Sequence, residues 1–398
     1  MREYAMQGFR PEIDLLLSCA RTCPDPAASN RTRELLGYEI DWPYLLRMAE
    51  RHGLIPLLYW NLKATSPESV PFSIMERIHA QFLTNARRNF ILTGELLKIL
   101  NLLEANGILA IPFKGPVLAS SLYGNLALRT FSDLDILVVK KDIIKAKDVL
   151  LSSGLQWGSQ LSSAQKANYK EDYGCLTFTD KSGRVWIELD RGLSLRELPW
   201  SFDLEHFARR LTQISLEGKM VPAFSPEDLL LILCLHGAKH CWTRLSWVCD
   251  LAELIRVYPG LDWGKVLVEA ATQGCSRTLL LGLLLAHNLV EIDLPEEVLN
   301  KIQAEPVVQS LGRSIGQWLL AEAAAPRGAW ALSLFYLRLS ENFKQRAVFS
   351  LRVVFTPTVE DLQDLPLPAP FSFLYYFTHP LRLLGKYGLD SARSITRV

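Results

Sequence analysis

An apolar run that opens with two acids constrains the fold of this chain more than any other feature. Residues 131–139 read FSDLDILVV. Side chains two positions apart in a strand point to the same face of a sheet, so Asp133 and Asp135 share a face. Both faces beyond them are apolar, which predicts an inner strand that is covered on both sides.

Two carboxylates at the entrance of such a strand need a neutralising partner, because like charges repel each other and resist the loss of water. A hard divalent cation bound by oxygen atoms is the natural partner for Asp133 and Asp135. For an isolated pair of this kind, a solvated turn or a cap is the alternative interpretation.

The segment RVWIELD (184–190) offers a third carboxylate, and with CLTFTD (175–180) it predicts a hairpin. Alternation puts Glu188 and Asp190 on one face. Glu188 lies between apolar neighbours and is expected to point inward, whereas Asp190 is near the strand end and is expected to be exposed. Three carboxylates around one or two magnesium ions are the usual apparatus of phosphoryl and nucleotidyl transfer.

The segment FKGP (113–116) ends one predicted strand and begins a helix. Gly115 suits the turn, and Pro116 suits the first helical position. Backbone N–H groups and the Lys114 ammonium then lie where an anion can bind. An ordinary surface lysine is the alternative for Lys114.

Apolar periodicity divides the chain into a small α+β core between two helical regions. The expected strands cover 108–113, 134–139, 175–180 and 184–190, and the expected helices cover 42–63 in two pieces, 89–107, 141–155, 225–242, 245–258, 263–274 and 276–290. We therefore expect a helical region over 1–105, a mixed-sheet core over 106–192, a helical domain over 193–355, and a Pro-rich loop with an aromatic and basic tail over 356–398.

Taken together, FKGPVLASSLYG, LRTFSDLDILV, WIELD and LHGAKHCWTRLSWVCDLAELI resemble the nucleotidyltransferase superfamily that includes DNA polymerase beta. More narrowly, the chain is similar to the uncharacterised bacterial nucleotidyltransferase family of NTP_transf_5 type over most of residues 40–260. The resemblance implies a metal-dependent enzyme that moves an NMP from an NTP to a hydroxyl group of an acceptor and releases pyrophosphate.

The resemblance also implies roles for individual residues. Asp133 and Asp135 would hold Mg²⁺ or Mn²⁺, and Glu188 would be the third ligand or the base. Lys114 and Gly115 would face the triphosphate, with ATP as the expected nucleotide. The chain departs from the superfamily here, because Lys-Gly-Pro stands where a Gly-Ser turn is usual.

Two residues beside the acidic pair, Arg129 and Ser132, would contact phosphate or orient Asp133. Arg129 is equally suited to be the structural partner of an acid. Both interpretations stay open at this point.

Polar residues in the segment HGAKHCWTRLSWVCD fall on one face if its helix is continuous: His236, His240, Trp247 and Asp250. One interpretation is a seam facing the nucleotide or the acceptor, in which Lys239, His240 and Asp250 bind base, sugar or phosphate. The other is a helix–helix interface with histidine–aspartate pairs.

Bulk properties narrow the remaining choices. The net charge of +1 gives no broad attraction to nucleic acid. The scattered cysteines, an N-terminus without a signal-peptide pattern and apolar runs too short to span a bilayer predict a cytoplasmic chain without a membrane span. The tail (371–388) either packs on the helical body or lies on a membrane surface.

Two further functions remain as alternatives: a catalytically degenerate nucleotide-binding or scaffold protein, and a toxin-like nucleotidyltransferase that modifies tRNA. The acceptor, whether small molecule, protein or RNA, and the oligomeric state stay open.

Overall fold

A five-stranded mixed sheet forms the centre of the computed structural model, which describes residues 10–158, 175–190, 204–321, 329–357 and 369–383 and the single positions 361, 365 and 367. The strand order is β1-β2-β5-β4-β3. The parallel pair β2–β5 lies between antiparallel neighbours. The strands are β1 (Ala110–Pro112), β2 (Leu134–Val138), β3 (Gln156–Trp157), β4 (Leu176–Thr179) and β5 (Trp186–Asp190). This arrangement confirms the predicted α+β class.

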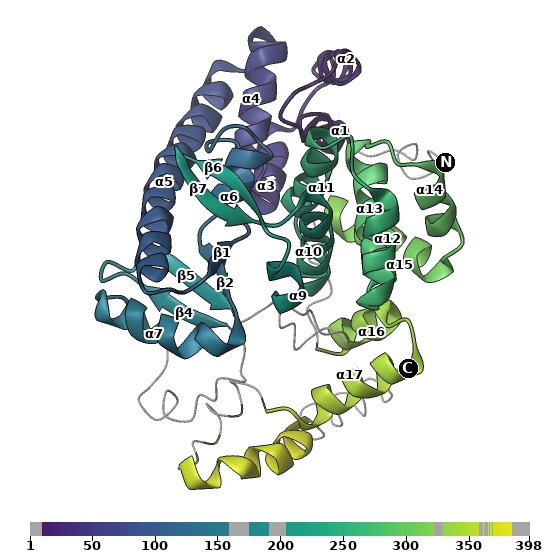
Figure 1. The fold of residues 1–398 in the computed structure, drawn as a ribbon. Coiled ribbons are helices and arrows are strands. Elements are labelled where there is room, and N and C mark those ends of the chain that lie inside the picture. The colour runs from purple at the N-terminus through teal and green to yellow at the C-terminus, as the bar shows by residue number, and fades with distance from the viewer. Residues whose placement is uncertain are drawn as a thin grey trace.

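The strand that opens with the two acids is an inner strand, and every residue of β2 is buried. Leu134, Ile136 and Val138 pack into one apolar cluster with α5 (Phe72–Ala105) and α7 (Ile143–Ser152). Leu137 points the other way, into the core of the helical regions. Figure 1 shows the sheet lying between α5 and α7 on one side and α10 (Pro226–Lys239) with α11 (Leu245–Val257) on the other.

The N-terminal region is helical, as predicted. Its helices are α1 (Pro11–Ser18), α2 (Pro26–Leu35), α3 (Trp42–His52), α4 (Ile55–Thr65) and α5. Gly53 ends α3 with a left-handed φ of 70°, which explains why residues 42–63 form two helices rather than one. The helix predicted over 89–107 is much longer, because α5 runs for 34 residues. Its first half buries few side chains, so the apolar period there is weak.

A hairpin interrupts the helices that were expected after residue 192. It consists of β6 (Thr212–Leu216) and β7 (Lys219–Ala223), and its two turn residues, Glu217 and Gly218, both have positive φ. This is the backbone that a two-residue hairpin turn requires. The sequence analysis missed it, because glutamate is an uncommon residue at a positive φ.

A short helix, α9 (Leu204–Ala208), precedes the hairpin. The helices after it are α10, α11, α12 (Trp263–Thr272), α13 (Ser276–Val290), α14 (Glu296–Gln303), α15 (Pro306–Leu320), α16 (Ala329–Leu339) and α17 (Phe343–Phe355). The predicted N-cap of α10 is confirmed, since Ser225 Oγ accepts a hydrogen bond from the Asp228 N–H. Most of the Pro-rich loop and the end of the basic tail lie outside the described residues. Among the helices that are described, none is long and apolar enough to cross a membrane.

Candidate active site

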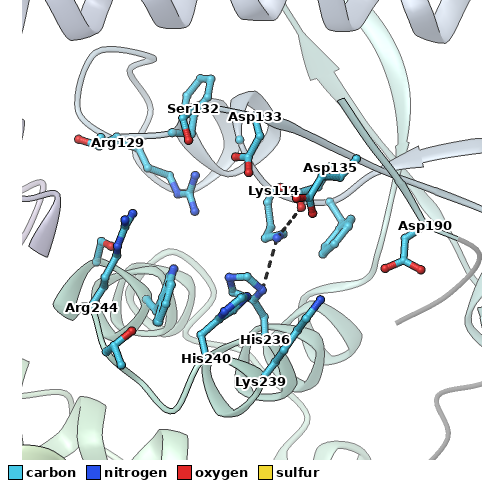
Figure 2. A pocket seen from close by; sticks show the side chains of 18 residues that line it. Lys114, Arg129, Ser132, Asp133, Asp135, Asp190, His236, Lys239, His240 and Arg244 are labelled. Atoms are coloured by element: carbon cyan, nitrogen blue, oxygen red, sulfur yellow. Dashed lines mark hydrogen bonds and ion pairs between the residues drawn. The ribbon is translucent and has the colours of Figure 1, made fainter. Parts of the chain in front are cut away.

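A pocket of about 470 Å³ lies between the acid-bearing face of the sheet and the end of α10 with the turn that follows it. Eighteen residues line it, and they come from three segments of the chain, within 113–135, 188–190 and 236–247. Figure 2 shows the acids of the sheet on one side and the lysine, histidine and arginine side chains of the helical segment on the other. One wall of the pocket is therefore acidic and the other is basic.

The acidic wall consists of Asp133, Asp135, Glu188 and Asp190. Asp135 and Glu188 are direct neighbours on the parallel strands β2 and β5. Burial raises the pKa of Asp133 and of Glu188, and the charge of Asp135 raises both further. The rise means that the local positive charge does not fully offset burial and repulsion among these carboxylates.

Lys114 links the two walls. Its ammonium lies 2.6 Å from Asp135 Oδ1 and 3.3 Å from His236 Nδ1 (Figure 2). The side chain is only 12% exposed, so it is not the ordinary surface lysine that was the alternative. It leaves the turn between β1 and α6 (Pro116–Ser121), where Gly115 has a φ of 53°. A side chain at Gly115 would be strained and would approach the Asp133 carbonyl.

The helical wall carries His236 and Lys239 from α10, His240 and Arg244 from the turn that follows, and Trp247 from α11. The three rings form one cluster, with centroids 4.8 Å apart for His236–His240, 5.4 Å for His236–Trp247 and 5.1 Å for His240–Trp247. Burial and the surrounding cations, including Lys114 and Lys239, lower the pKa of both histidines. Both rings are therefore neutral at pH 7.

The ring cluster forms although the helix is not continuous. α10 ends at Lys239 and α11 begins at Leu245. Between them Cys241 and Trp242 have φ values of 50° and 53°. Non-glycine residues rarely adopt this conformation, and here the fully buried Trp242 side chain anchors the turn.

Arg129 and Asp250 form an ion pair beside the pocket. Arg129 donates to Asp250 from Nε and from Nη2, each at 2.8 Å, and Tyr123 donates to the same carboxylate at 2.8 Å. Asp250 is 1% exposed and is not part of the lining, so the structure does not bring it together with the other predicted nucleotide contacts. Arg129 lines the pocket while serving as the structural partner of an acid.

The structure thus gathers nine of the ten predicted site residues around one pocket. They are Lys114, Gly115, Arg129, Ser132, Asp133, Asp135, Glu188, Lys239 and His240. It adds Asp190 and Arg244, which the sequence analysis did not select. The expectation that Asp190 is exposed was wrong, because it is half-buried and shares the pocket face with Glu188. Strand alternation had already placed Asp190 on the same face as Glu188, whereas nothing in the sequence indicated that Arg244 would line the pocket.

The acidic residues match a magnesium or manganese site in donor type, since both ions prefer carboxylate oxygen. As the side chains stand, no three histidine, cysteine, aspartate or glutamate side chains in the described part of the chain are gathered into a metal-binding group. Lys114 instead supplies the positive charge next to Asp135. Asp133, Asp135 and Glu188 therefore match such an ion in donor type, and strand register makes Asp135 and Glu188 neighbours. Lys114 contacts one of these acids, Asp135.

Comparison with known proteins gives two matches. A search of curated proteins found no significant similarity. Among solved structures, an antigenic nucleotidyltransferase-like protein from Paracoccidioides brasiliensis matches with a TM-score of 0.33 and 17% sequence identity, covering 57% of this chain and 92% of that chain. A TM-score of this size does not establish a common fold. A family model described as "Uncharacterised nucleotidyltransferase" matches residues 38–291, which is most of the chain, and the protein belongs to this family.

Proposed function

We propose that this protein transfers an NMP from an NTP to a hydroxyl group of an acceptor and releases pyrophosphate. The observation that carries the proposal is the opposition of charges across one pocket, with four carboxylates along the sheet and Lys114, Lys239 and Arg244 facing them. A metal–triphosphate complex has the matching polarity, because its cation seeks carboxylates and its phosphates seek ammonium and guanidinium groups.

In this proposal Asp133, Asp135 and Glu188 hold Mg²⁺ or Mn²⁺. When bound, the ion would offset negative charge on the phosphates and lower the pKa of the attacking hydroxyl. Lys114 would then leave Asp135 for a phosphate oxygen, a short move because its ammonium already lies inside the pocket.

The protein's own groups would supply the remaining steps. The acceptor oxygen forms a bond to the α-phosphorus while the bond from that phosphorus to the bridging oxygen breaks, and pyrophosphate departs. If Asp133 and Asp135 hold the ion without Glu188, Glu188 would instead accept the hydroxyl proton, a role that its raised pKa favours. Lys239 and Arg244 would stabilise the charge that develops on the leaving group.

The ring cluster offers a surface for the nucleobase. Trp247 is half-buried and lines the pocket beside two neutral histidines. Stacking of a base on an aromatic side chain contributes about 1–3 kcal/mol and does not depend strongly on which base is bound. ATP remains the expected nucleotide.

The Lys114–Asp135 pair favours a second candidate, a nucleotide-binding protein that uses no metal. In that case Lys114 stays as the counter-charge of Asp135, and the nucleotide binds through Lys239, Arg244 and the rings. The two candidates differ in one measurable property, the dependence of nucleotide affinity on magnesium.

Calorimetric titration with each of the four NTPs, with and without magnesium, tests the proposal. The informative variant is Asp133→Asn/Asp135→Asn, and the matched control is Asp148→Asn, which changes an exposed acid on α7. Magnesium-dependent binding that the double variant loses and the control keeps would support the proposal. NTP affinity that is the same with and without magnesium, and the same for the wild type and the double variant, would favour the second candidate.

The transferred group needs its own test. Cell extract is incubated with the protein and with NTP labelled in either the α- or the γ-phosphate. We expect the label to reach an acceptor only from the α position. Transfer from the γ position would instead indicate a kinase and would overturn the proposed reaction.

A further inference from the structure

An exposed apolar surface covers the C-terminal arm, which we define as α17 together with residues 369–383. Figure 1 shows this arm beginning beside α16 (Ala329–Leu339) and extending away from the sheet. Seven large apolar side chains on it are between 39% and 68% exposed, and an eighth, Phe343, is 84% exposed. They are Phe343, Leu351, Val354, Phe355, Phe371, Phe373, Phe377 and Leu381. A surface of this kind marks an interaction site.

The exposed side chains of α17 form a single stripe. Phe343, Leu351, Val354 and Phe355 follow the spacing i, i+8, i+11 and i+12, which places them on one side of a helix. The opposite side holds Phe349, which is 2% exposed and contacts the Tyr336 ring with centroids 5.8 Å apart. The helix is therefore attached to the protein by one side and presents a second apolar side outward.

Residues 369–383 repeat this arrangement. Tyr375 and His379 are buried, and His379 Nε2 lies 3.1 Å from the Val353 carbonyl oxygen of α17. Phe373, Phe377 and Leu381, at i, i+4 and i+8, point outward. Both parts of the arm thus expose an aromatic stripe.

The charges of α17 have one sign. Its sequence, FKQRAVFSLRVVF, contains three cations and no acid. Lys344, Arg346 and Arg352 are exposed, and they form no ion pair within the described part of the chain. Cations beside an outward apolar stripe are typical of helices that lie in the interface of an anionic bilayer.

We propose that the C-terminal arm docks this protein on an anionic lipid surface, with the two aromatic stripes buried among the lipid headgroups. A contact between two copies of the chain would bring these like charges together, and their mutual repulsion would oppose it. This inference does not depend on the proposed transfer reaction.

Docking of the arm would also fix the pocket relative to the membrane. Tyr336 of α16, against which α17 packs, donates a hydrogen bond of 2.7 Å to the Lys239 carbonyl at the end of α10. Lys239 lines the pocket, so α17 is connected to the candidate active site through Tyr336 of α16.

Vesicle flotation tests the inference with the full chain. The vesicles contain phosphatidylcholine alone or phosphatidylcholine mixed with phosphatidylglycerol. We expect about a hundredfold stronger partitioning onto the anionic vesicles, because three cations contribute near their surface, and we expect added salt to weaken it.

Three variants separate the contributions. Phe343→Ser/Leu351→Ser/Phe355→Ser is expected to lower partitioning by at least about tenfold. Arg346→Gln/Arg352→Gln should reduce the preference for anionic vesicles. The matched control is Phe72→Ser/Phe90→Ser, which alters side chains on α5 that are 82% and 68% exposed and should leave partitioning unchanged.

The inference is overturned if the wild type fails to float with anionic vesicles, or if the triple variant floats as well as the wild type. It is also overturned if sedimentation shows a dimer that the triple variant abolishes, since the stripe would then be a protein interface. NTP binding measured on the same triple variant should equal that of the wild type, so loss of lipid binding and loss of the nucleotide site are distinguishable.

Discussion

Arg129 and Asp250 lie 121 positions apart in the chain and share two hydrogen bonds of 2.8 Å between guanidinium and carboxylate. Both side chains are buried. The pair joins the segment that precedes β2 to helix α11. The position of the acidic pair at Asp133 and Asp135 therefore depends on packing against the helical region, and not only on the sheet.

Removal of the Asp250 carboxylate from this ion pair should destabilise the folded protein. We expect Asp250→Ala to lower the free energy of unfolding by about 3–5 kcal/mol, because it leaves the Arg129 charge buried and deprives Tyr123 of its acceptor. Urea unfolding followed by circular dichroism measures this. The matched control is Glu50→Gln, which breaks an exposed ion pair with Arg77 and should cost less than about 1 kcal/mol. Equal losses for the two variants would contradict the structural role given to Asp250.

The strained turn after α10 depends on the absence of a side chain at Gly237. A Cβ atom there would lie 2.5 Å from carbons of the buried Trp242 ring. We expect Gly237→Ala to destabilise the protein by about 1–3 kcal/mol through overpacking, and to weaken nucleotide binding because the turn carries Arg244. Thermal unfolding and NTP titration are the measurements.

Gly94 provides the control for this substitution. It lies inside α5, and a Cβ atom there would have no neighbour within 4 Å. Gly94→Ala should therefore stabilise the protein by up to about 1 kcal/mol, as expected for alanine in a helix. If Gly237→Ala instead stabilised the protein, the Trp242 ring would be able to move aside, and the overpacking expected here would be contradicted.

Metal-dependent nucleotide binding should weaken in mild acid. The pKa values of Glu188 and Asp133 are raised, so these carboxyls take up protons at a higher pH than usual, and a protonated carboxyl does not attract a cation. We expect affinity for the magnesium–NTP complex to fall by up to about tenfold per pH unit and per carboxyl below the raised pKa. Calorimetry over a pH series measures it. Glu188→Gln should show a shallower dependence, and an unchanged slope would exclude Glu188 as a ligand.

His52 should make stability depend on pH. It is fully buried, its Nδ1 accepts the Leu245 N–H at the start of α11 at 3.2 Å, and burial lowers its pKa to about 4. The unfolded chain, with a pKa near 6.5, then binds more protons than the folded chain between the two values. The stabilisation is complete above pH 6.5 and is lost as the pH falls toward 4, by up to about 3 kcal/mol.

Urea unfolding at several pH values between these limits tests this expectation. His52→Gln cannot take up the proton, so its unfolding free energy should fall less over the same range than that of the wild type. The difference between the two curves isolates His52 from the carboxyls, which titrate in the same range. Parallel curves would show that His52 is not the titrating group.

Much of the fold was predictable because the pattern of apolar residues and turn residues in a short segment indicates its secondary structure. Alternation in FSDLDILVV correctly predicted an inner strand, and both acids line one pocket beside it. Gly53 correctly divided two helices, and the hairpin of β4 and β5 was found from its pattern. The hairpin of β6 and β7 was missed, since its turn uses a glutamate at positive φ that packing must enforce.

The sequence by itself therefore determined four of the five strands of the central sheet, many of the helices, and the acids that share one face with Glu188, because these follow from the two- and 3.6-residue periods of the backbone. Only the tertiary structure decided that Lys114 contacts Asp135, that Asp250 pairs with Arg129 instead of facing the pocket, and that Arg244 enters it. Each of these relationships joins segments about 20 to 120 positions apart. The first depends on how the turn after β1 lies against β2 and the other two on how α10 and α11 pack against the sheet, and no local period of the chain encodes that packing.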